Sequence, residues 1–270
     1  MSLIKAPFGA IVANDKGGVG KSTCTLILAD LLILNGVTPK VIQVDEQERL
    51  STLLGTQVLR IVPRLEDARR DPKALMAAYA PIYHACAAAA KDGSAVLIEI
   101  GANQLAGFEA WLKAVDLDED LRSWNLPLVA MVLTPGEIEA VRKAAVALQT
   151  FRRSLPWAQR VFIENRYGQK TIKDLATRAD TAAILRKELM PALKGAQRLS
   201  MPAVEADSWA ACESAGIRFI KALAMKPDDL AQRLGEDIAN VKVMRGDLAR
   251  FFKAMHAQFS QVFALPKGGE

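Results

Sequence analysis

One short stretch of this chain carries the residues best suited to chemistry on a phosphate group. Between Asn14 and Thr23 it combines three glycines with two lysines and the hydroxyl group of Ser22. Glycines let the backbone curl so that successive N–H groups point at one anion, and a helix that starts here adds partial positive charge. Lys21 is placed to reach the β- and γ-phosphates of a nucleotide, and the Ser22 hydroxyl to hold Mg²⁺. We therefore predict a binding site for ATP and Mg²⁺.

The flanking residues indicate the elements that hold this loop. The apolar run from Phe8 to Ala13 predicts a buried strand, and the run from Cys24 to Leu34 predicts a buried helix that ends at Gly36. A strand, a glycine-rich loop, Lys-Ser and a helix together form the setting of a P-loop. The spacing departs from the ordinary P-loop because Asp15 stands where the first glycine is usual.

The string KGGVGKST, from Lys16 to Thr23, resembles the deviant Walker A motif of the ParA/MinD family of ATPases. The resemblance implies that Lys16 reaches across a dimer to the phosphates bound by the partner, so that Lys16 and Lys21 are both catalytic. It also implies that a continuous run of residues contacts the nucleotide. These residues are Gly17, Gly18, Val19, Gly20, Lys21, Ser22 and Thr23.

An acidic residue ends the second expected strand, which runs from Val41 to Asp45. The family pattern here is Asp-x-Asp-x-Gln, and this chain keeps the second aspartate as Asp45 but has Gln43 in place of the first. The resemblance implies that Asp45 orients the attacking water and approaches Mg²⁺ through a water. A residue at this point could instead cap the following loop. The carboxyl end of a parallel strand, where ligands of α/β proteins bind, favours the catalytic role.

A second acidic residue, Glu99, lies near the end of the buried strand expected from Ala95 to Gly101. An apolar run that ends in a carboxylate resembles a Walker B pattern, which places one acid beside Mg²⁺. The resemblance makes Ser22, Asp45 and Glu99 the metal-binding residues. The family usually has aspartate at the position of Glu99, and this departure concerns the rate of hydrolysis more than nucleotide binding.

Strands and helices continue to alternate beyond this point, which predicts a doubly wound α/β fold with a mostly parallel sheet and helices on both faces. Further strands are expected at 127–133 and 160–166, and 198–204 is expected to be a last strand or a loop that closes over the base. The resemblance implies that Asn165 and Arg166 meet the adenine, since an amide both donates and accepts hydrogen bonds.

Composition limits the class of protein. The chain has 270 residues and three widely spaced cysteines, which argue against a disulfide scaffold and for a reducing compartment, here the cytoplasm. The chain has no uninterrupted apolar run of about 18 residues, so we predict no membrane-spanning helix. Thirteen basic and four acidic residues lie between Arg142 and Arg198, in a chain whose net charge is +5. This excess suggests a polyanionic partner such as duplex DNA, although a solvated helical surface has the same composition.

The remaining segments are expected to be mainly helical. The alanine-rich run 65–91 predicts a helix broken at Pro81, and 116–120 predicts an acidic surface loop. The last helix, about 245–263, carries an apolar stripe that either binds a membrane, as in MinD-type proteins, or packs on the domain. Few basic groups lie on its polar face, which favours packing. We expect one P-loop ATPase domain over 1–270, with a helical C-terminal part from about residue 207.

These expectations combine into a dimer switch that binds and hydrolyses ATP. The favoured function is of ParA type: two chains pair around ATP, the dimer binds DNA without reading its sequence, and hydrolysis releases it. Such a switch would serve plasmid or chromosome partition or DNA transfer on the nucleoid, with an adaptor protein that stimulates hydrolysis. Three alternatives stay open: a MinD-like positioning ATPase on a membrane, a metabolic enzyme that uses ATP to activate a carboxylate, and a relative that hydrolyses ATP weakly.

Overall fold

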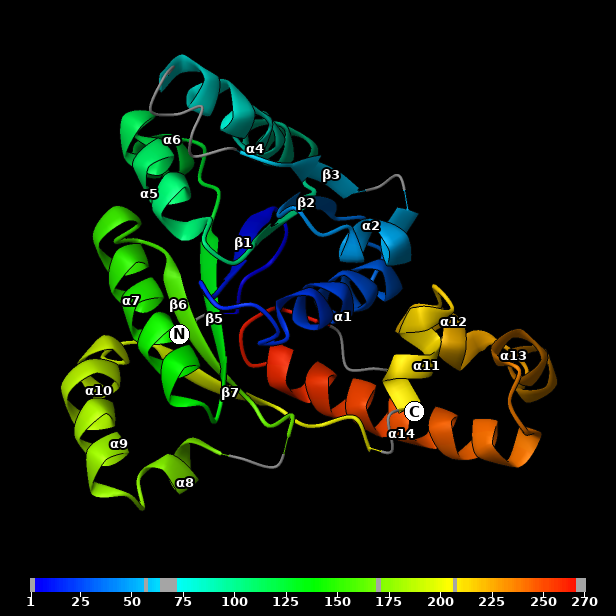
Figure 1. Ribbon diagram of the computed structural model, residues 1–270. Helices are drawn as coiled ribbons and strands as arrows, with labels where there is room; N and C mark the ends of the chain where they lie inside the picture. Colours follow the sequence, from blue (N-terminus) through cyan, green and yellow to red (C-terminus); the bar gives the residue numbers. More distant parts are fainter. Residues whose placement is uncertain (1–2, 56–57, 64–71, 169–170, 206–207, 266–270) are drawn as a thin grey trace.

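A sheet of seven strands runs through the centre of the molecule, in the order β3-β2-β4-β1-β5-β6-β7 (Figure 1). The computed structural model describes residues 3–55, 58–63, 72–168, 171–205 and 208–265. Every pairing between neighbouring strands is parallel, so the expected doubly wound α/β fold is confirmed. The strands are β1 (Phe8–Ala13), β2 (Lys40–Val44), β3 (Val58–Ile61), β4 (Ala95–Ile100), β5 (Leu128–Pro135), β6 (Gln159–Asn165) and β7 (Gln197–Met201).

Strand β1 lies at the point where the strand order changes direction. After β1 the chain builds one half of the sheet through β2, β3 and β4, and it then builds the other half through β5, β6 and β7. Ligands of open α/β sheets bind beyond the carboxyl ends of the strands at such a switch point. The loop that follows β1 therefore occupies the place where this fold binds ligands.

Helices cover both faces of the sheet and bury a separate apolar cluster on each (Figure 1). On one face lie α1 (Lys21–Leu34), α2 (Arg49–Leu54), α11 (Ser208–Ser214), α12 (Phe219–Ala224), α13 (Pro227–Leu234) and α14 (Ile238–Phe259). On the other face lie α4 (Pro72–Asp92), α5 (Leu105–Ala114), α6 (Leu117–Ser123) and α7 (Ile138–Ser154), followed at the β6–β7 edge by α8 (Ile172–Leu175), α9 (Ala179–Ile184), the π-helix η2 (Leu185–Leu189) and α10 (Met190–Ala192).

A buried ion pair joins the C-terminal helices to α1. Arg218, at the start of α12, donates from Nε to Asp30 Oδ1 at 2.5 Å, and the backbone N–H of Ile220 donates to Asp30 Oδ2 at 3.1 Å. Asp30 is inaccessible to solvent. A charge buried this deeply requires a partner, because removing one member of such a pair leaves the other uncompensated.

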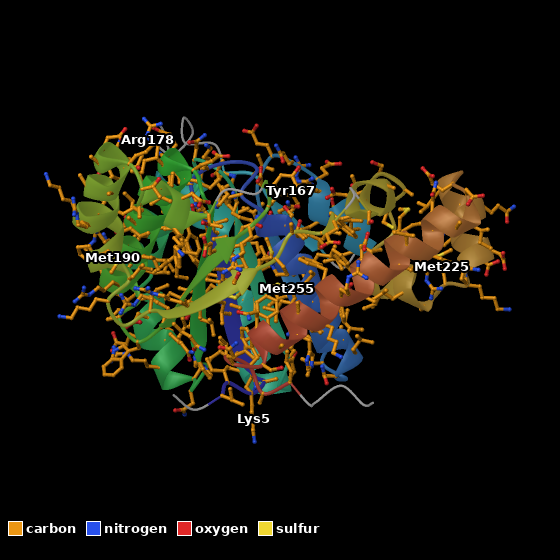
Figure 2. The ribbon with its side chains drawn as sticks, turned by 90° about the horizontal axis from the view of Figure 1, so that it is seen from below. Lys5, Tyr167, Arg178, Met190, Met225 and Met255 are labelled. Atoms are coloured by element: carbon orange, nitrogen blue, oxygen red, sulfur yellow. The ribbon has the colours of Figure 1, made fainter. Side chains whose placement is uncertain are left out.

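The last helix packs on the domain, as its sequence favoured. The apolar stripe of α14 contributes Leu248, Phe251, Met255 and Phe259 to the cluster beneath α1. Figure 2 shows Met255 of α14 near the middle of the molecule. The helix begins at Ile238, seven residues before the expected start at Arg245. In the described part of the chain, no helix has the length and apolar character needed to cross a membrane.

Two local predictions were wrong, each for a physical reason. The helix α4 continues through Pro81, because its buried side chains Tyr79, Ile82 and Cys86 pack on the sheet and outweigh the hydrogen bond that proline removes. The described part of the predicted 65–91 helix begins at Pro72. The acidic segment 116–120 is largely helical, since its acids lie in the first turn of α6, where the helix dipole favours negative charge.

Candidate functional site

The glycine-rich loop follows β1 and ends at Gly20, which lies immediately before α1. Gly18 and Gly20 have positive φ values of 73° and 96°, a region that favours glycine. Gly20 also has no room for a side chain. A Cβ there would lie 2.5 Å from Asn165 Nδ2 and 2.8 Å from Met201 Cε. The loop can therefore approach the ends of β6 and β7 only if this residue is glycine.

Lys21 lies beneath the loop, and its ammonium group donates to two of the loop's own carbonyl oxygens. The Nζ–O distances are 3.0 Å to Asn14 and 2.8 Å to Lys16. The residue is only 6% exposed. Burial lowers the pKa of Lys21, while the nearby carboxylates, Glu99 foremost, act in the opposite direction. The cation is thus held at the centre of the loop.

Asn14 fixes the start of the loop to β5 and α7. Its buried amide donates from Nδ2 to the carbonyl oxygens of Leu133 at 2.6 Å and Ala140 at 3.1 Å. Its Oδ1 accepts from the backbone N–H of Lys16 at 3.0 Å. Sequence reasoning assigned no role to Asn14, because both carbonyl partners lie more than a hundred residues away in the chain.

The outer side of the loop carries Lys16 and Asp15. Lys16 Nζ lies 2.5 Å from Glu137 Oε2, just before α7, and the two side chains are 36% and 55% exposed. Asp15 accepts from the backbone N–H of Leu105 at 3.4 Å and pairs with Lys143 at 3.5 Å. The two lysines of the motif therefore differ: Lys21 is enclosed, and Lys16 lies at the surface in an ion pair with its own chain.

Glu99 lies beside Ser22 at the end of β4. The Ser22 hydroxyl donates to Glu99 Oε1 at 2.8 Å, and the Gln43 amide donates to the same oxygen at 3.3 Å. Gln43 and Glu99 are register partners on neighbouring strands, and both are buried. Burial raises the pKa of Glu99, whereas the Ser22 hydrogen bond and the charge of Lys21 act to lower it. Gln43 is therefore in direct contact with the acid that replaces the usual aspartate.

Two buried oxygens beside this contact have no hydrogen-bond partner in the described structure: Glu99 Oε2 and Gln43 Oε1. Buried polar atoms are normally satisfied, so unpaired oxygens beside a hydroxyl suit a hard cation. Oxygen ligands are those that Mg²⁺ prefers. The residues present at this end of β2 and β4 therefore fit Mg²⁺, with Ser22, Asp45 and Glu99 as the candidate ligands.

Asp45 follows β2 and lies against Gly101. Its Oδ1 accepts from the backbone N–H of Gln47 at 3.1 Å, and a Cβ at Gly101 would lie 2.5 Å from its Oδ2. Arg60 of β3 holds the same loop: its Nε donates to the Asp45 carbonyl oxygen at 3.3 Å, and its other nitrogens contact the Glu46 carbonyl oxygen and the Glu48 carboxylate. The sequence predicted neither β3 nor the contacts of Arg60.

A cavity of about 320 Å³ opens beside the loop, towards β6 and β7. Asn165 lines this cavity. The side-chain amide of Asn165 donates to the Val19 carbonyl oxygen at 2.9 Å and accepts from the Tyr167 backbone N–H at 3.1 Å. The residues that line the cavity are Gly18, Gly20, Thr23, Arg49, Asn165, Tyr167, Met201, Pro202, Ala203, Val204, Trp209, Ala210 and Glu213. Its size and lining suit a planar base, since ligand pockets are mostly apolar with a few polar groups.

Two helices on the same face of the sheet, α2 and α11, also line this cavity. Arg49 of α2 and Glu213 of α11 form a two-pronged ion pair, with N–O distances of 2.7 and 2.9 Å. Trp209 stacks on Phe219 with ring centroids 3.8 Å apart. The segment 202–204, expected as part of a strand or closing loop, is loop, and it lines the cavity after β7 ends at Met201.

The predicted site residues differ in how closely they approach the loop, and Asp45 acts on Lys21 and Glu99 through its charge rather than through a hydrogen bond. The loop contains Lys16 and is followed directly by Lys21 and Ser22. Lys21 donates to the Lys16 carbonyl oxygen, and Ser22 donates to Glu99. Arg166 is exposed and is not among the residues that line the cavity, and its backbone N–H donates to the Met201 carbonyl oxygen at 2.9 Å. Its proposed contact with adenine stays a prediction.

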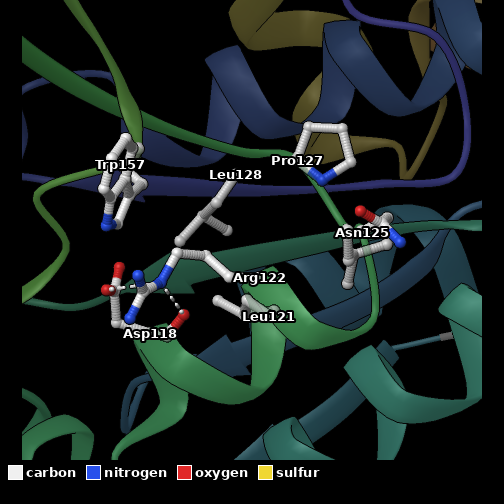
Figure 3. Close-up of a pocket in the computed structure, with 9 residues that line it drawn as sticks. Asp118, Leu121, Arg122, Asn125, Pro127, Leu128 and Trp157 are labelled. Carbon is white, nitrogen blue, oxygen red and sulfur yellow. Dashed lines mark hydrogen bonds and ion pairs between the residues drawn. The ribbon is translucent and has the colours of Figure 1, made fainter.

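A separate hollow of about 280 Å³ lies around Trp157, beside α6 and the start of β5 (Figure 3). The Trp157 side chain is 70% exposed, and Arg122 lies over its ring at 5.5 Å from the centroid. Arg122 also pairs with Asp118 at 3.5 Å. Because this hollow lies by the amino ends of the strands, it is distinct from the loop after β1.

Comparison with known proteins places the chain among nucleotide-binding domains. Residues 10–242 match a family model described as the CobQ/CobB/MinD/ParA nucleotide binding domain. None of the curated proteins matches the chain. Among solved structures, the septum site-determining protein MinD from Pyrococcus horikoshii OT3, in complex with Mg-ADP, has 17% identity and a TM-score of 0.50, with 92% of this chain and 93% of that chain covered.

Two further solved structures are similar at lower scores. A chain of the MinC:MinD cell division protein complex from Aquifex aeolicus has 17% identity and a TM-score of 0.48, covering 88% of this chain and 96% of that one. A plasmid partition protein from Borrelia burgdorferi has 16% identity and a TM-score of 0.43, covering 92% and 99%. At sequence identities this low, the similarity to these solved structures concerns the fold alone.

The packing around Gly20 makes a testable prediction. Gly20→Ala should weaken nucleotide binding by more than about tenfold, because the left-handed backbone and the clash with Asn165 displace the loop. Gly17→Ala is the matched control, since a Cβ at Gly17 meets nothing within 4 Å, and its affinity should stay within about threefold. Titration of a fluorescent ADP analogue measures both. Equal losses would show that the constraint on Gly20 is not its packing against Asn165.

The contact between Gln43 and Glu99 makes a second prediction, read as the affinity of the ADP complex for Mg²⁺. Glu99→Asp should lose the reach to Ser22, and Gln43→Asp should place two carboxylates at paired positions. Each change should weaken Mg²⁺ binding about tenfold, while the double substitution, which restores the usual pair of aspartates, should recover most of the loss. The coupling expected from such neighbours is at least about 1 kcal/mol. Additive losses would contradict it.

Proposed function

The chain belongs to the CobQ/CobB/MinD/ParA family of nucleotide-binding domains, and we propose that it is an ATP-hydrolysing dimer switch of ParA type that acts on duplex DNA. One observation carries this proposal: Lys16 lies at the surface beside the loop, while Lys21 is buried beneath it. A lysine that served its own site alone would not need to be at the surface. An exposed one is available to the site of a second chain.

The residues around the loop have distinct tasks in this proposal. The backbone N–H groups of residues 17–23 and the ammonium of Lys21 bind the phosphates. Ser22, Glu99 and Asp45 hold Mg²⁺, which when bound neutralises the charge that develops on the phosphates. Asp45 accepts a hydrogen bond from the attacking water and orients it. Asn165 connects the phosphate loop to the cavity for the base through the Val19 carbonyl oxygen.

Lys16 changes partner when two chains pair. Its ion pair with Glu137 is exposed, and pairs of this kind contribute only about 0–1 kcal/mol. Phosphates carry more negative charge than one carboxylate, so the lysine can leave Glu137 for the nucleotide of the partner at low cost. ATP then determines the oligomeric state, and hydrolysis reverses it. An adaptor protein that stimulates hydrolysis would set the lifetime of the dimer.

Duplex DNA is the favoured surface on which the switch acts. The basic segment 142–198 is partly neutralised, since Arg142, Lys143, Arg153 and Arg178 form ion pairs with Glu188, Asp15, Glu109 and Asp180. Exposed basic residues such as Arg152, Lys187 and Lys194 form no ion pair in the described structure and are available to phosphates. Lys170, also in this segment, lies outside the described residues. Pairing doubles this charged surface and so raises affinity for a long polyanion.

A membrane surface is the weaker alternative, because the apolar stripe of α14 is buried. A specific observation supports another candidate, a switch that binds ATP but hydrolyses it slowly. Glu99 is longer than the usual aspartate, and its Oε1 already accepts from Ser22 and Gln43. These contacts leave only Oε2 of this carboxylate to hold Mg²⁺. Slow hydrolysis would lengthen the life of the dimer without changing its assembly.

The role of Lys16 predicts a loss of assembly on substitution. Lys16→Ala should abolish dimer formation with a non-hydrolysable ATP analogue, measured by light scattering after gel filtration, and leave ADP binding within about threefold. Lys113→Ala is the control, because Lys113 is also an exposed lysine in an ion pair, with Glu109 at 2.8 Å. An unchanged dimer in the Lys16 variant would rule out a role in the partner's site.

The DNA-binding role predicts a dependence on both nucleotide and salt. The protein with ATP should bind duplex DNA at low salt, and binding should be lost with ADP and weaken steeply as salt rises. Lys187→Glu with Lys194→Glu should reduce affinity more than about tenfold. Arg233→Glu with Lys242→Glu makes the same change of charge on the C-terminal helices and should have a small effect. If no nucleotide state binds DNA, the segment is a solvated surface, and liposome binding becomes the next test.

A further inference from the structure

A cavity of about 540 Å³ lies at the edge of the sheet, between β6 and β7 on one side and the helices from α8 to α10 on the other. Arg178 and Met190 mark these helices at one end of the molecule in Figure 2, away from α14. The residues that line the cavity are Phe162, Glu164, Ile172, Lys173, Ala176, Ala182, Leu185, Arg186, Leu189, Met190, Leu193, Arg198 and Leu199. None of them belongs to the glycine loop or lines the cavity beside it.

The interior of this cavity is apolar. Phe162 of β6 faces Leu185, Leu189 and Leu193 in the apolar cluster on this side of the sheet. Met190, at the mouth, is an exposed large apolar side chain. The volume falls in the range of about 300–1,000 Å³ typical of pockets for small molecules. The cavity is therefore large enough to enclose an apolar body.

The charged groups around it are mostly basic. Lys173, Arg186 and Arg198 line the cavity and are exposed, and neither arginine forms an ion pair in the described structure. The one acid in the lining is Glu164, whose Oε1 accepts from the backbone N–H of Ile172 at 2.8 Å. Three cations against one carboxylate favour a ligand that carries negative charge.

One wall of the cavity has an unusual backbone. Residues Leu185–Leu189 form a π-helix between α9 and α10, and three of them, Leu185, Arg186 and Leu189, line the cavity. Single turns of π-helix are rare and occur frequently at functional sites. In this turn the buried Leu185 and Leu189 lie on the apolar side, while Arg186 is exposed. The same short segment thus supplies both the apolar wall and a cation.

We propose that this cavity binds a small amphipathic anion, a molecule with one carboxylate and an apolar body. The apolar interior takes the body of the ligand, and Arg186 and Arg198 pair with its carboxylate. The backbone of a nucleic acid supplies charge without an apolar body, so it matches the rim of the cavity but not its interior. The inference is independent of ATP chemistry, because it uses no residue of the nucleotide site.

Calorimetric titration of the full chain with decanoate, below its micelle concentration, tests the proposal. Decanoate should bind saturably at one site per chain. Acetate has the charge without the tail and decyltrimethylammonium has the tail without the negative charge, so each should bind at least about tenfold more weakly. If acetate or inorganic phosphate binds as tightly, the site recognises charge alone. Equal binding of decyltrimethylammonium, or no saturable binding of decanoate, would also overturn the proposal.

Matched variants locate the site. Arg186→Glu with Arg198→Glu should weaken decanoate binding by more than about tenfold. Lys187→Glu with Lys194→Glu changes the charge equally on the same segment, but neither residue lines the cavity, so affinity should stay within about twofold. Ala182→Phe, which adds a ring to the lining, should abolish binding in a chain that still binds ADP. Equal losses in both charge variants, or binding retained in Ala182→Phe, would place decanoate elsewhere.

Discussion

The burial of one ammonium group constrains the geometry of the whole site. Lys21 lies beneath the loop at the start of α1, where water cannot solvate it, so its charge must be met by oxygens of the protein. The carbonyl groups of Asn14 and Lys16 supply two of them, which requires the chain to curl around the lysine. That curl in turn requires glycine at position 20 and an anchor at Asn14. Glu99 and Asp45 then compensate the charge from the neighbouring strands.

The fold and the central loop could be predicted from the sequence because their signals are local. Strand β1, the glycines and the lysines occupy sixteen consecutive positions, 8 to 23, and the buried strands β4 and β5 are apolar except for Glu99 and Thr134. The short β3 gave no such signal, since only four residues form it and two are exposed. Arg60 was missed with it, although it holds the loop that carries Asp45.

What the sequence could not reveal were contacts between residues far apart in the chain. Asn14 at the start of the loop donates to carbonyl oxygens of β5 and α7, and Lys16 pairs with Glu137 just before α7, and no spacing in the sequence encodes these contacts. At Pro81 the local sequence led to a wrong prediction, because the helix α4 continues through this proline. A proline predicts a break when a helix is considered alone, but tertiary packing of the surrounding apolar face kept α4 continuous.

The ion pair between Asp30 and Arg218 has a consequence for how the molecule could be divided. Asp30 belongs to α1, the helix that follows the glycine loop, and Arg218 follows α11, whose Trp209 lines the cavity beside that loop. A chain cut after β7 would leave a carboxylate in the core without a counterion and uncover the apolar side of α1. The helices after β7 are therefore part of the folding unit of the nucleotide site. The glycine loop and the cavity beside it therefore lie on segments that depend on one another for folding.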